Sequence, residues 1–163
     1  MNIRFSIIIP CYNVEKYIEE CLDSIISQEE QSWEAICTDD GSEGFKGLVT
    51  AMLEKLVTED GKVYDQAVAI GPMIMMKFVT MTAAKCNLPL VESLNTLMVD
   101  GTGMCGACRV TVGGKTRFAC VEGPEFDAHQ IDFDEAMARG AMYRDFERHA
   151  HEATCNLFAK EVE

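Results

Sequence analysis

Histidine is nearly absent from this sequence. Only three of the 163 residues are histidine, and none lies before His129. There is also no apolar run as long as a membrane span, no signal-peptide cleavage pattern, no internal repeat and no low-complexity linker. Basic residues are few, 14 lysines and arginines against 27 acidic residues, and the net charge of −13 argues against nucleic acid and anionic membranes as partners.

Cysteine, by contrast, is abundant, with eight residues in the chain. Three of them lie close together with a metal-type spacing, so we expect a reducing, cytoplasmic setting rather than a framework of disulfides. The other five have no spacing partner and are interpreted as structural: Cys11, Cys21, Cys37, Cys86 and Cys155. The remaining composition, 48% hydrophobic and 25% charged, is typical of a globular domain.

The stretch that indicates chemistry contains Asp100, Cys105, Cys108 and Cys120. Two residues separate Cys105 from Cys108, so both sulfurs can point into one tight loop, and nearby glycines leave the backbone free to wrap a compact group. Plant-type [2Fe–2S] proteins have the pattern Cys-x4-Cys-x2-Cys followed by a distant Cys. Here aspartate stands in place of the first cysteine, and a carboxylate can also ligate iron.

A β-hairpin is predicted to bring the third cysteine to this loop. Two β-rich runs separated by Gly113-Gly114 favour a hairpin with a two-residue turn. A register that pairs Val112 with Lys115 sets Cys108 opposite Ala119, and the next residue then lies beside the cysteine loop. Three sulfurs are therefore expected to converge.

Several interpretations of three converging thiolates are open. A disulfide would leave one cysteine over, and zinc would require a fourth cysteine or a histidine at a familiar spacing. Buried, unreactive cysteines that only fill the core are the structural alternative. An iron–sulfur cluster fits best, with Asp100 and the three cysteines as its ligands.

Three runs of sequence carry a family resemblance: Ala69–Val79, Met98–Asp134 and, most specifically, Val99–Gly114. Through them residues 36–147 resemble the small subunit of NADH-dependent reduced ferredoxin:NADP oxidoreductase, also called sulfide dehydrogenase. More distantly they resemble the iron–sulfur electron-transfer subunit of dihydroorotate dehydrogenase. In that family the matching aspartate and three cysteines bind a [2Fe–2S] cluster.

The resemblance implies a one-electron relay within a pyridine-nucleotide- and flavin-dependent oxidoreductase. The expected cofactor is the [2Fe–2S] cluster, with NAD(P) as a further one, and the expected partner is a larger flavin and iron–sulfur oxidoreductase subunit or a ferredoxin. The family's N-terminal flavin-binding barrel and Gly-rich first nucleotide turn have no counterpart here. Their absence counts against FAD and indicates an oxidoreductase subunit or a fragment of one.

The first 42 residues resemble a different family. Ser6–Ile25 and Trp33–Ser42 look like the opening of an inverting family-2 glycosyltransferase, whose Pro-x-Tyr-Asn loop and following aspartate contact the nucleotide of a sugar donor. The corresponding residues here are Pro10, Tyr12, Asn13 and Asp39 or Asp40. We expect neither a downstream Asp-x-Asp metal motif nor a base region of that family, so glycosyl transfer by this chain alone is not expected. Binding of a nucleotide sugar is the alternative function.

The two resemblances meet at Thr38–Ser42, because both families have a strand followed by Asp-Asp-Gly-Ser. The chain is therefore interpreted as a chimera in which one strand–helix–strand unit replaces another. The predicted fold is α/β: a ferredoxin-reductase-like parallel nucleotide-binding sheet with helices on both faces, a small [2Fe–2S]-binding hairpin segment and a C-terminal helix. The predicted domains are 1–97 (1–42 glycosyltransferase-like, 43–97 ferredoxin-reductase-like), 98–124 and 125–163.

Hydrophobic periodicity predicts the individual elements. Buried strands are expected at 4–10, 33–38, 66–70 and 90–94. Helices are expected after Asn13, from Glu43, from Pro72 and over 132–148 with a weak point at Gly140, and a turn over 122–127. Four residues of the third helix are predicted to point inward: Met73, Ile74, Phe78 and Val79.

Two groups of residues are predicted to contact a nucleotide, since ligands of such sheets bind at the carboxyl ends of the strands. The first resembles the family's turn at the nicotinamide end and consists of Gly71, Pro72, Met73 and Met75, although methionines at helical spacing also commonly fill cores. The second would contact the ribose or 2′-phosphate, or else form only a turn: Asp39, Asp40, Gly41 and Ser42.

Overall fold

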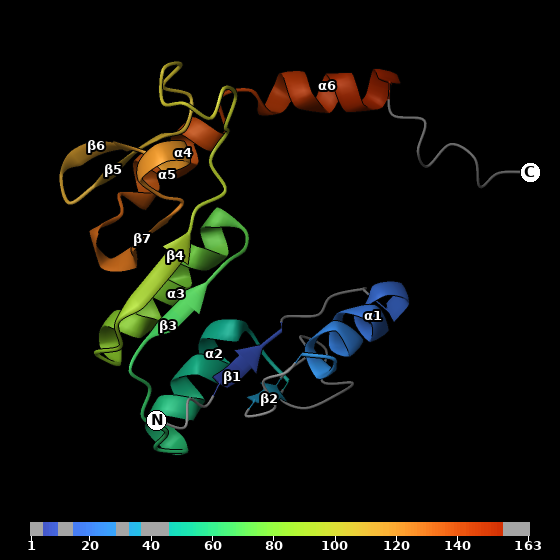
Figure 1. Ribbon diagram of the computed structural model, residues 1–163, viewed down its shortest axis with the longest axis vertical. Coiled ribbons are helices and arrows are strands. Elements are labelled where there is room, and N and C mark those ends of the chain that lie inside the picture. Colours follow the sequence, from blue (N-terminus) through green and yellow to red (C-terminus); the bar gives the residue numbers. More distant parts are fainter. Residues whose placement is uncertain (1–4, 10–14, 29–32, 37–45, 155–163) are drawn as a thin grey trace, which may run out of the picture. The chain divides into compact units, whose positions relative to one another are not determined.

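The computed structural model describes residues 5–9, 15–28, 33–36 and 46–154 (Figure 1). Its helices and strands confirm the predicted α/β class. The chain forms two compact units, one made of residues 1–65 and 81–88 and the other of residues 66–80 and 89–163. Among the described residues, the parallel strands are divided between two separate sheets, one in each unit, and not joined in one.

The first unit opens with a strand–helix–strand motif: β1 (Phe5–Ile8), α1 (Glu15–Ile26) and β2 (Trp33–Ile36). The two strands pair in parallel along their whole described length, as the apolar runs predicted. Apolar residues of α1 recur at helical spacing, and Ile18, Leu22 and Ile25 are accordingly half-buried on one face. The Tyr64 hydroxyl donates to Ser6 Oγ at 2.9 Å and ties β1 to a later part of the same unit.

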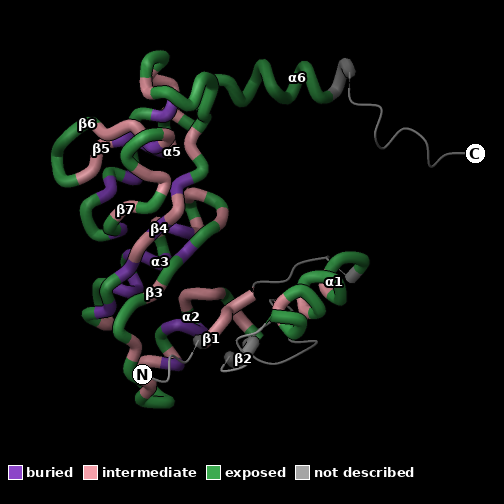
Figure 2. Tube along the Cα trace, in the orientation of Figure 1, coloured by how far each residue is buried: buried purple, intermediate pink, exposed green. Residues whose placement is uncertain are grey.

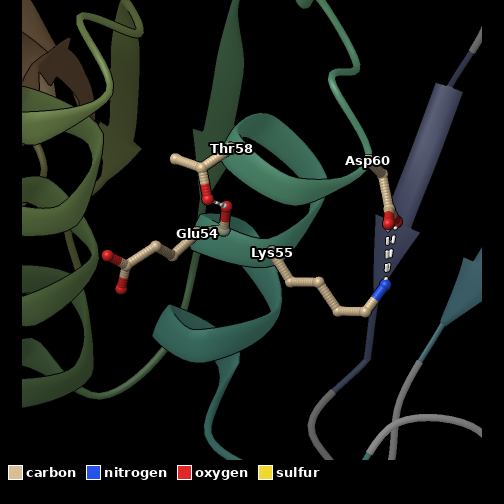
Figure 3. Close-up of polar contacts among 4 residues, drawn as sticks. All are labelled: Glu54, Lys55, Thr58 and Asp60. Carbon is tan, nitrogen blue, oxygen red and sulfur yellow. Dashed lines mark hydrogen bonds and ion pairs between the residues drawn. The ribbon is translucent and has the colours of Figure 1, made fainter.

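The second helix begins at Val49, later than predicted, because Leu48 has an extended backbone with ψ of 152°. It runs as α2 (Val49–Glu54) and continues into a π-helical turn, η1 (Lys55–Glu59). Within this turn Thr58 Oγ1 donates to the Glu54 carbonyl, and Lys55 Nζ lies 2.8 Å from Asp60 Oδ1 (Figure 3). The Asp60 N–H donates to the carbonyl of Lys55, and Asp60 caps the end of the helix.

A second strand–helix–strand motif consists of β3 (Ala67–Ala69), α3 (Met73–Lys85) and β4 (Leu90–Ser93). Both strands and residues 73–80 of the helix belong to the second unit. Strands β3 and β4 pair in parallel, as predicted. A third strand, β7 (Glu125–Asp127), pairs antiparallel with the other edge of β4. The prediction of a turn over 122–127 was therefore wrong, because the open edge of β4 provides backbone partners that no local pattern reveals.

The predicted hairpin is confirmed, together with its register. Strands β5 (Arg109–Val112) and β6 (Lys115–Phe118) are antiparallel, with Val112 opposite Lys115. Both turn glycines have positive φ, 59° and 71°, as a type I′ turn requires. The Ala119 N–H donates to the Cys108 carbonyl at 3.2 Å, which continues the pairing to the first residue of a short helix, α4 (Ala119–Glu122).

The core of the second unit joins α3 and the end of β4 to the hairpin and to residues 131–136. Its buried residues are Met76, Leu94, Val110, Ile131, Phe133 and Ala136. The prediction that Ile74 and Phe78 point inward was wrong, since both are about half exposed. The buried residues of α3 are instead Met76, Val79 and Ala83, which recur at helical spacing. Of the predicted inward residues, Val79 is therefore buried as expected.

The segment after β7 completes the unit with η2 (Ala128–Gln130) and two helices, α5 (Phe133–Gly140) and α6 (Arg144–Thr154). Asp132 caps α5, because its Oδ1 accepts the Glu135 N–H at 3.0 Å. The predicted weak point at Gly140 is confirmed, because α5 ends at this residue and a separate helix begins at Arg144. The side chains of α6 are exposed from Arg144 to His151 (Figure 2). None of the described helices is both long and apolar enough to cross a membrane.

One acidic side chain of the second unit is fully buried. Glu92, in the central strand β4, has no exposed surface. Its Oε1 accepts a hydrogen bond of 2.7 Å from Thr80 Oγ1, while Oε2 has no hydrogen-bond partner among the described residues. Burial raises the pKa of this carboxyl above its ordinary value of 4.5, although the Thr80 hydroxyl and the charge of His129 act in the opposite direction.

Glu92 should make the stability of the chain fall with increasing pH. Its pKa is raised in the folded state, so that state binds more protons than the unfolded chain above pH 4.5, and stability is lost as the pH rises through the folded pKa. Glu92→Gln cannot ionise. We therefore expect the free energy of unfolding of this variant, measured in urea, to rise relative to that of the wild type as the pH increases from 4.5 towards neutrality. Exposed Glu54→Gln is the control, and parallel profiles for Glu92→Gln and the wild type would contradict the prediction.

Two valines in strands allow the same substitution at a buried and an exposed site. Val110 is 1% exposed and Val68 is 64% exposed. Val110→Ala should lower the free energy of unfolding by about 1.5–3 kcal/mol, the contribution of a fully buried valine. Val68→Ala should change it by less than about 0.5 kcal/mol. Equal losses in urea unfolding would mean that the core is not centred on β5.

Candidate metal centre

The hairpin brings two of the predicted ligands into contact. Cys108 directly precedes β5 and Cys120 lies in α4, just after β6. Their sulfurs are 3.2 Å apart. That separation is far longer than a disulfide bond of about 2.0 Å. It is slightly shorter than the roughly 3.8 Å between two sulfurs that each lie about 2.3 Å from one tetrahedral metal ion. If the two sulfurs moved slightly further apart, both could therefore bind a single ion.

The two thiols of this pair differ in acidity. Burial raises the pKa of Cys108, which is only 1% exposed, but hydrogen bonds from the backbone and thiol of Cys120 outweigh it, and the net pKa lies below the ordinary value. The pKa of Cys120 is raised, first by its hydrogen bond to the Cys108 sulfur. Cys108 is thus the residue of the pair that more readily provides a thiolate, the form that binds metals.

The loop between β4 and β5 is shaped by Asp100. Its Oδ1 accepts the Thr102 N–H at 2.8 Å, and its Oδ2 accepts the Cys105 N–H at 2.9 Å. The first of these hydrogen bonds, helped by the second, holds the pKa of the carboxyl below its ordinary value. Each oxygen of a carboxylate has a second lone pair, so Asp100 can hold the loop and still offer an oxygen to a metal.

Backbone N–H groups are directed at all three sulfurs. The Ala107 N–H lies 3.4 Å from Cys105 Sγ, and the Cys120 N–H lies 3.5 Å from Cys108 Sγ. The third sulfur, of Cys120, accepts a hydrogen bond from the backbone of Gly103. This hydrogen bond lowers the pKa of Cys120, whereas its contact with Cys108 raises it. Such N–H groups stabilise negative charge on sulfur and tune the electronic properties of a metal bound to it.

Gly103 shows why this loop needs glycine. Its φ is +81°, a backbone conformation that side chains disfavour. A Cβ atom at this position would also lie only 3.1 Å from Cγ2 of Val121. The loop therefore approaches α4 closely enough for the N–H of Gly103 to reach the sulfur of Cys120.

The predicted ligands form two pairs. Cys108 and Cys120 touch through their sulfurs, while Asp100 and Cys105 are joined through the Cys105 N–H. The charge of Asp100 raises the pKa of Cys120, which indicates that the two pairs are neighbours. Within the described part of the chain, no three Cys, His, Asp or Glu side chains are arranged around one ion. Two pairs suit a binuclear cluster, in which bridging sulfides complete the coordination of each iron, better than a mononuclear zinc site with four protein ligands.

Glu122 supports the centre and was not predicted from the sequence. Its Oε2 accepts the Phe118 N–H at 2.9 Å, and its Oε1 lies 2.5 Å from Nη1 of Arg117. These two contacts, in that order, hold the pKa of its carboxyl below the ordinary value. The carboxylate thereby fastens the end of β6 to the helix that carries Cys120. A glutamate two residues after a ligand has no distinctive spacing, so no sequence signal marked it.

The residues predicted to contact nicotinamide lie at the carboxyl end of β3 and the start of α3. Met73 and Met75 pack against the core of the second unit, in keeping with the structural alternative. A Cβ atom on Gly71 would lie 2.6 Å from Cε of Met75, so glycine permits this close packing. Nucleotide contact by Gly71, Pro72 and the two methionines stays a prediction.

The remaining predicted nucleotide contacts lie outside the described residues: Pro10, Tyr12, Asn13, Asp39, Asp40, Gly41 and Ser42. The expectation that no Asp-x-Asp motif lies downstream was wrong, because Asp132-Phe133-Asp134 has this pattern. Asp132 caps α5, and Asp134 Oδ1 lies 2.6 Å from Nζ of Lys77. Both carboxylates therefore have structural partners in the second unit.

Comparison with known protein families confirms both resemblances predicted from the sequence. Residues 95–132 match the iron-sulfur cluster binding domain of dihydroorotate dehydrogenase B. Residues 6–68 match glycosyl transferase family 2. The first match contains Asp100 and the three cysteines of the candidate centre. The second contains the β1–α1–β2 motif except its first residue, Phe5.

Individual relatives agree with the first match. The dihydroorotate dehydrogenase B (NAD(+)) electron transfer subunit homolog of Thermotoga maritima is 52% identical over 117 residues, which cover 72% of this chain and 41% of that protein. An uncharacterized protein in the adh 3′ region of Clostridium beijerinckii is 60% identical over 109 residues, 67% of this chain and 37% of that protein.

A solved structure is also similar. It comes from the work on flavin-based electron bifurcation in the NADH-dependent reduced ferredoxin-NADP oxidoreductase, with 41% identity and a TM-score of 0.73. The match covers 92% of this chain and 52% of that chain. The chain thus spans about two fifths of the length of these curated relatives and about half of the solved chain.

Proposed function

We propose that this chain is an iron–sulfur electron-transfer component of a pyridine-nucleotide- and flavin-dependent oxidoreductase, of the ferredoxin:NADP oxidoreductase or sulfide dehydrogenase type. The observation that carries the proposal is the contact between the sulfurs of Cys108 and Cys120, 3.2 Å apart, beside the loop of Asp100 and Cys105. The similarity of residues 95–132 to an iron-sulfur cluster binding domain supports it.

The four ligands of a [2Fe–2S] cluster in this proposal are Asp100, Cys105, Cys108 and Cys120. Cys108 and Cys120 would bind one iron and the other pair the second, in keeping with their contacts. Such a cluster accepts and releases a single electron. The chain itself contributes the N–H groups directed at the sulfurs, and it shields one side of the centre, because Cys108 is 1% exposed.

The other side of the centre is open and apolar, which supports electron exchange with a partner protein there. Exposed apolar residues flank the loop: Leu97, Met98, Val99, Met104 and Val121. In this proposal the partner is a larger flavin and iron–sulfur oxidoreductase subunit or a ferredoxin. NAD(P) would bind near Gly71–Met75. The metal-type spacing of three of the eight cysteines supports a reducing, cytoplasmic setting.

A second candidate function rests on the match of residues 6–68 to glycosyl transferase family 2. It is binding of a nucleotide sugar by the N-terminal unit. Calorimetric titration with a UDP-sugar tests it, and saturable binding would support it. A chain that is colourless after iron and sulfide reconstitution and also binds the UDP-sugar would favour this candidate over electron transfer.

Purification without oxygen tests the main proposal directly. The chain should be brown, contain about two irons and two sulfides, and give an EPR signal on reduction. Cys105→Ser and Cys120→Ser should abolish the cluster, since each removes a thiolate ligand. Cys86→Ser is the matched control and should keep the full iron and sulfide content, because this half-buried thiol lies outside the centre.

Equal loss of cluster in all three serine variants would show that the ligand set is wrong. A wild-type chain that stays colourless after reconstitution would overturn the proposal as a whole.

Asp100 can be tested separately from the cysteines. Asp100→Cys should keep a cluster, because it restores the plant-type cysteine pattern, and should shift its midpoint potential, because a thiolate replaces a carboxylate. Asp100→Asn keeps an oxygen that can accept the Thr102 N–H but removes the negative charge, so we expect a much lower iron content. Iron and sulfide assays with an EPR redox titration measure both. A full cluster with unchanged potential in both variants would mean that Asp100 only shapes the loop.

A further inference from the structure

Arg139, on α5, reaches the turn that carries two of the proposed ligands. Its Nη2 donates a hydrogen bond of 3.2 Å to the carbonyl oxygen of Ala107, a half-buried contact between positions 32 residues apart. Within the described part of the chain, this guanidinium forms no ion pair with a carboxylate. Its positive charge is therefore directed at the loop, and none of the described acidic side chains neutralises it.

Ala107 lies at the centre of a tight turn. The Gly106 carbonyl accepts the Arg109 N–H at 3.3 Å, which closes a four-residue turn around Ala107 and Cys108. The N–H of Ala107 is directed at Cys105 Sγ at 3.4 Å, and its carbonyl is held by the guanidinium. A single residue thus connects Arg139 to the sulfur of one proposed ligand and, through its peptide bond, to the backbone of the next.

The helix that carries Arg139 is firmly held within the second unit. Asp132 caps its first turn, and Asp134 pairs with Lys77 of α3 at 2.6 Å. Phe133 and Ala136 are 8% and 6% exposed and belong to the core. Arg139 follows Ala136 by three residues, so it projects from nearly the same side of the helix. The guanidinium is therefore presented to the loop from a fixed support.

We propose that Arg139 is a positioning residue for the metal centre. It holds the Ala107 carbonyl, fixes the orientation of the Cys105–Cys108 turn and adds one positive charge beside it. The inference rests on the proposed function, because its consequence is a higher reduction potential. A nearby positive charge favours the more negative, reduced form of a cluster, and a fixed turn keeps the N–H groups directed at the sulfurs.

Three variants separate these effects. Arg139→Gln is shorter and uncharged, so it removes both the charge and the hydrogen bond to Ala107, whereas Arg139→Lys keeps the charge. Arg144→Gln removes an exposed arginine of α6 and is the matched control. In the metal-free chain at fixed pH, iodoacetamide should modify Cys108 about tenfold faster in Arg139→Gln than in the wild type, the scale expected from losing a charge-assisted hydrogen bond. Mass spectrometry of the modified peptides gives the rates.

The second measurement uses the chain reconstituted with iron and sulfide. An EPR-monitored redox titration should give a lower midpoint potential for Arg139→Gln, recovery of most of the difference in Arg139→Lys, and wild-type behaviour in Arg144→Gln. If Arg139→Gln does not fold, Arg139→Met keeps the aliphatic stem and should change both quantities in the same direction.

The inference would be overturned if Arg139→Gln had the same alkylation rate of Cys108 as Arg144→Gln, or the same midpoint potential. If the wild-type chain binds no iron and sulfide, the proposed function has failed. The alkylation rates of the metal-free chains then still decide whether Arg139 holds the turn.

Discussion

The pairing of β5 with β6 is the constraint on which the candidate centre depends. Its register is set by Gly113-Gly114, because a type I′ turn needs two residues with positive φ. A slip by one residue would turn the side chains of one strand to the opposite face and carry Cys120 away from Cys108. The contact between the two sulfurs, 3.2 Å apart, is therefore a consequence of turn geometry at the far end of the hairpin.

The second unit supports one side of this centre and leaves the other open. Val110 anchors the hairpin in a core shared with α3 and α5, and Cys108, two residues earlier, is buried at 1% exposure. Asp100 and Cys105 are exposed on the loop. A buried edge excludes water from part of the centre, whereas an exposed edge allows a redox partner to approach. This asymmetry is what an electron relay requires, and the contact of Arg139 with Ala107 places a cation at the supported side.

The N-terminal motif shows how little a strand–helix–strand unit demands of its sequence. Two short apolar strands and a helix with one apolar face are sufficient for β1, α1 and β2 to form, since parallel strands need a crossover between them. The same motif recurs as β3, α3 and β4 with unrelated residues. Sequence similarity to a glycosyltransferase over the first of these two motifs is thus compatible with structural similarity of most of the chain to an oxidoreductase.

The sequence by itself determined the features that depend on short-range patterns: the first four strands, the hairpin with its register, the break at Gly140 and the spacing of the proposed ligands. Tertiary structure alone decided the rest. The pairing of β7 with β4, the exposure of Ile74 and Phe78, the burial of Glu92 beside Thr80 and the reach of Arg139 to Ala107 each join residues distant in the chain. Local propensity carries no information about such neighbours, because burial and hydrogen bonding between distant segments are settled only when the elements pack.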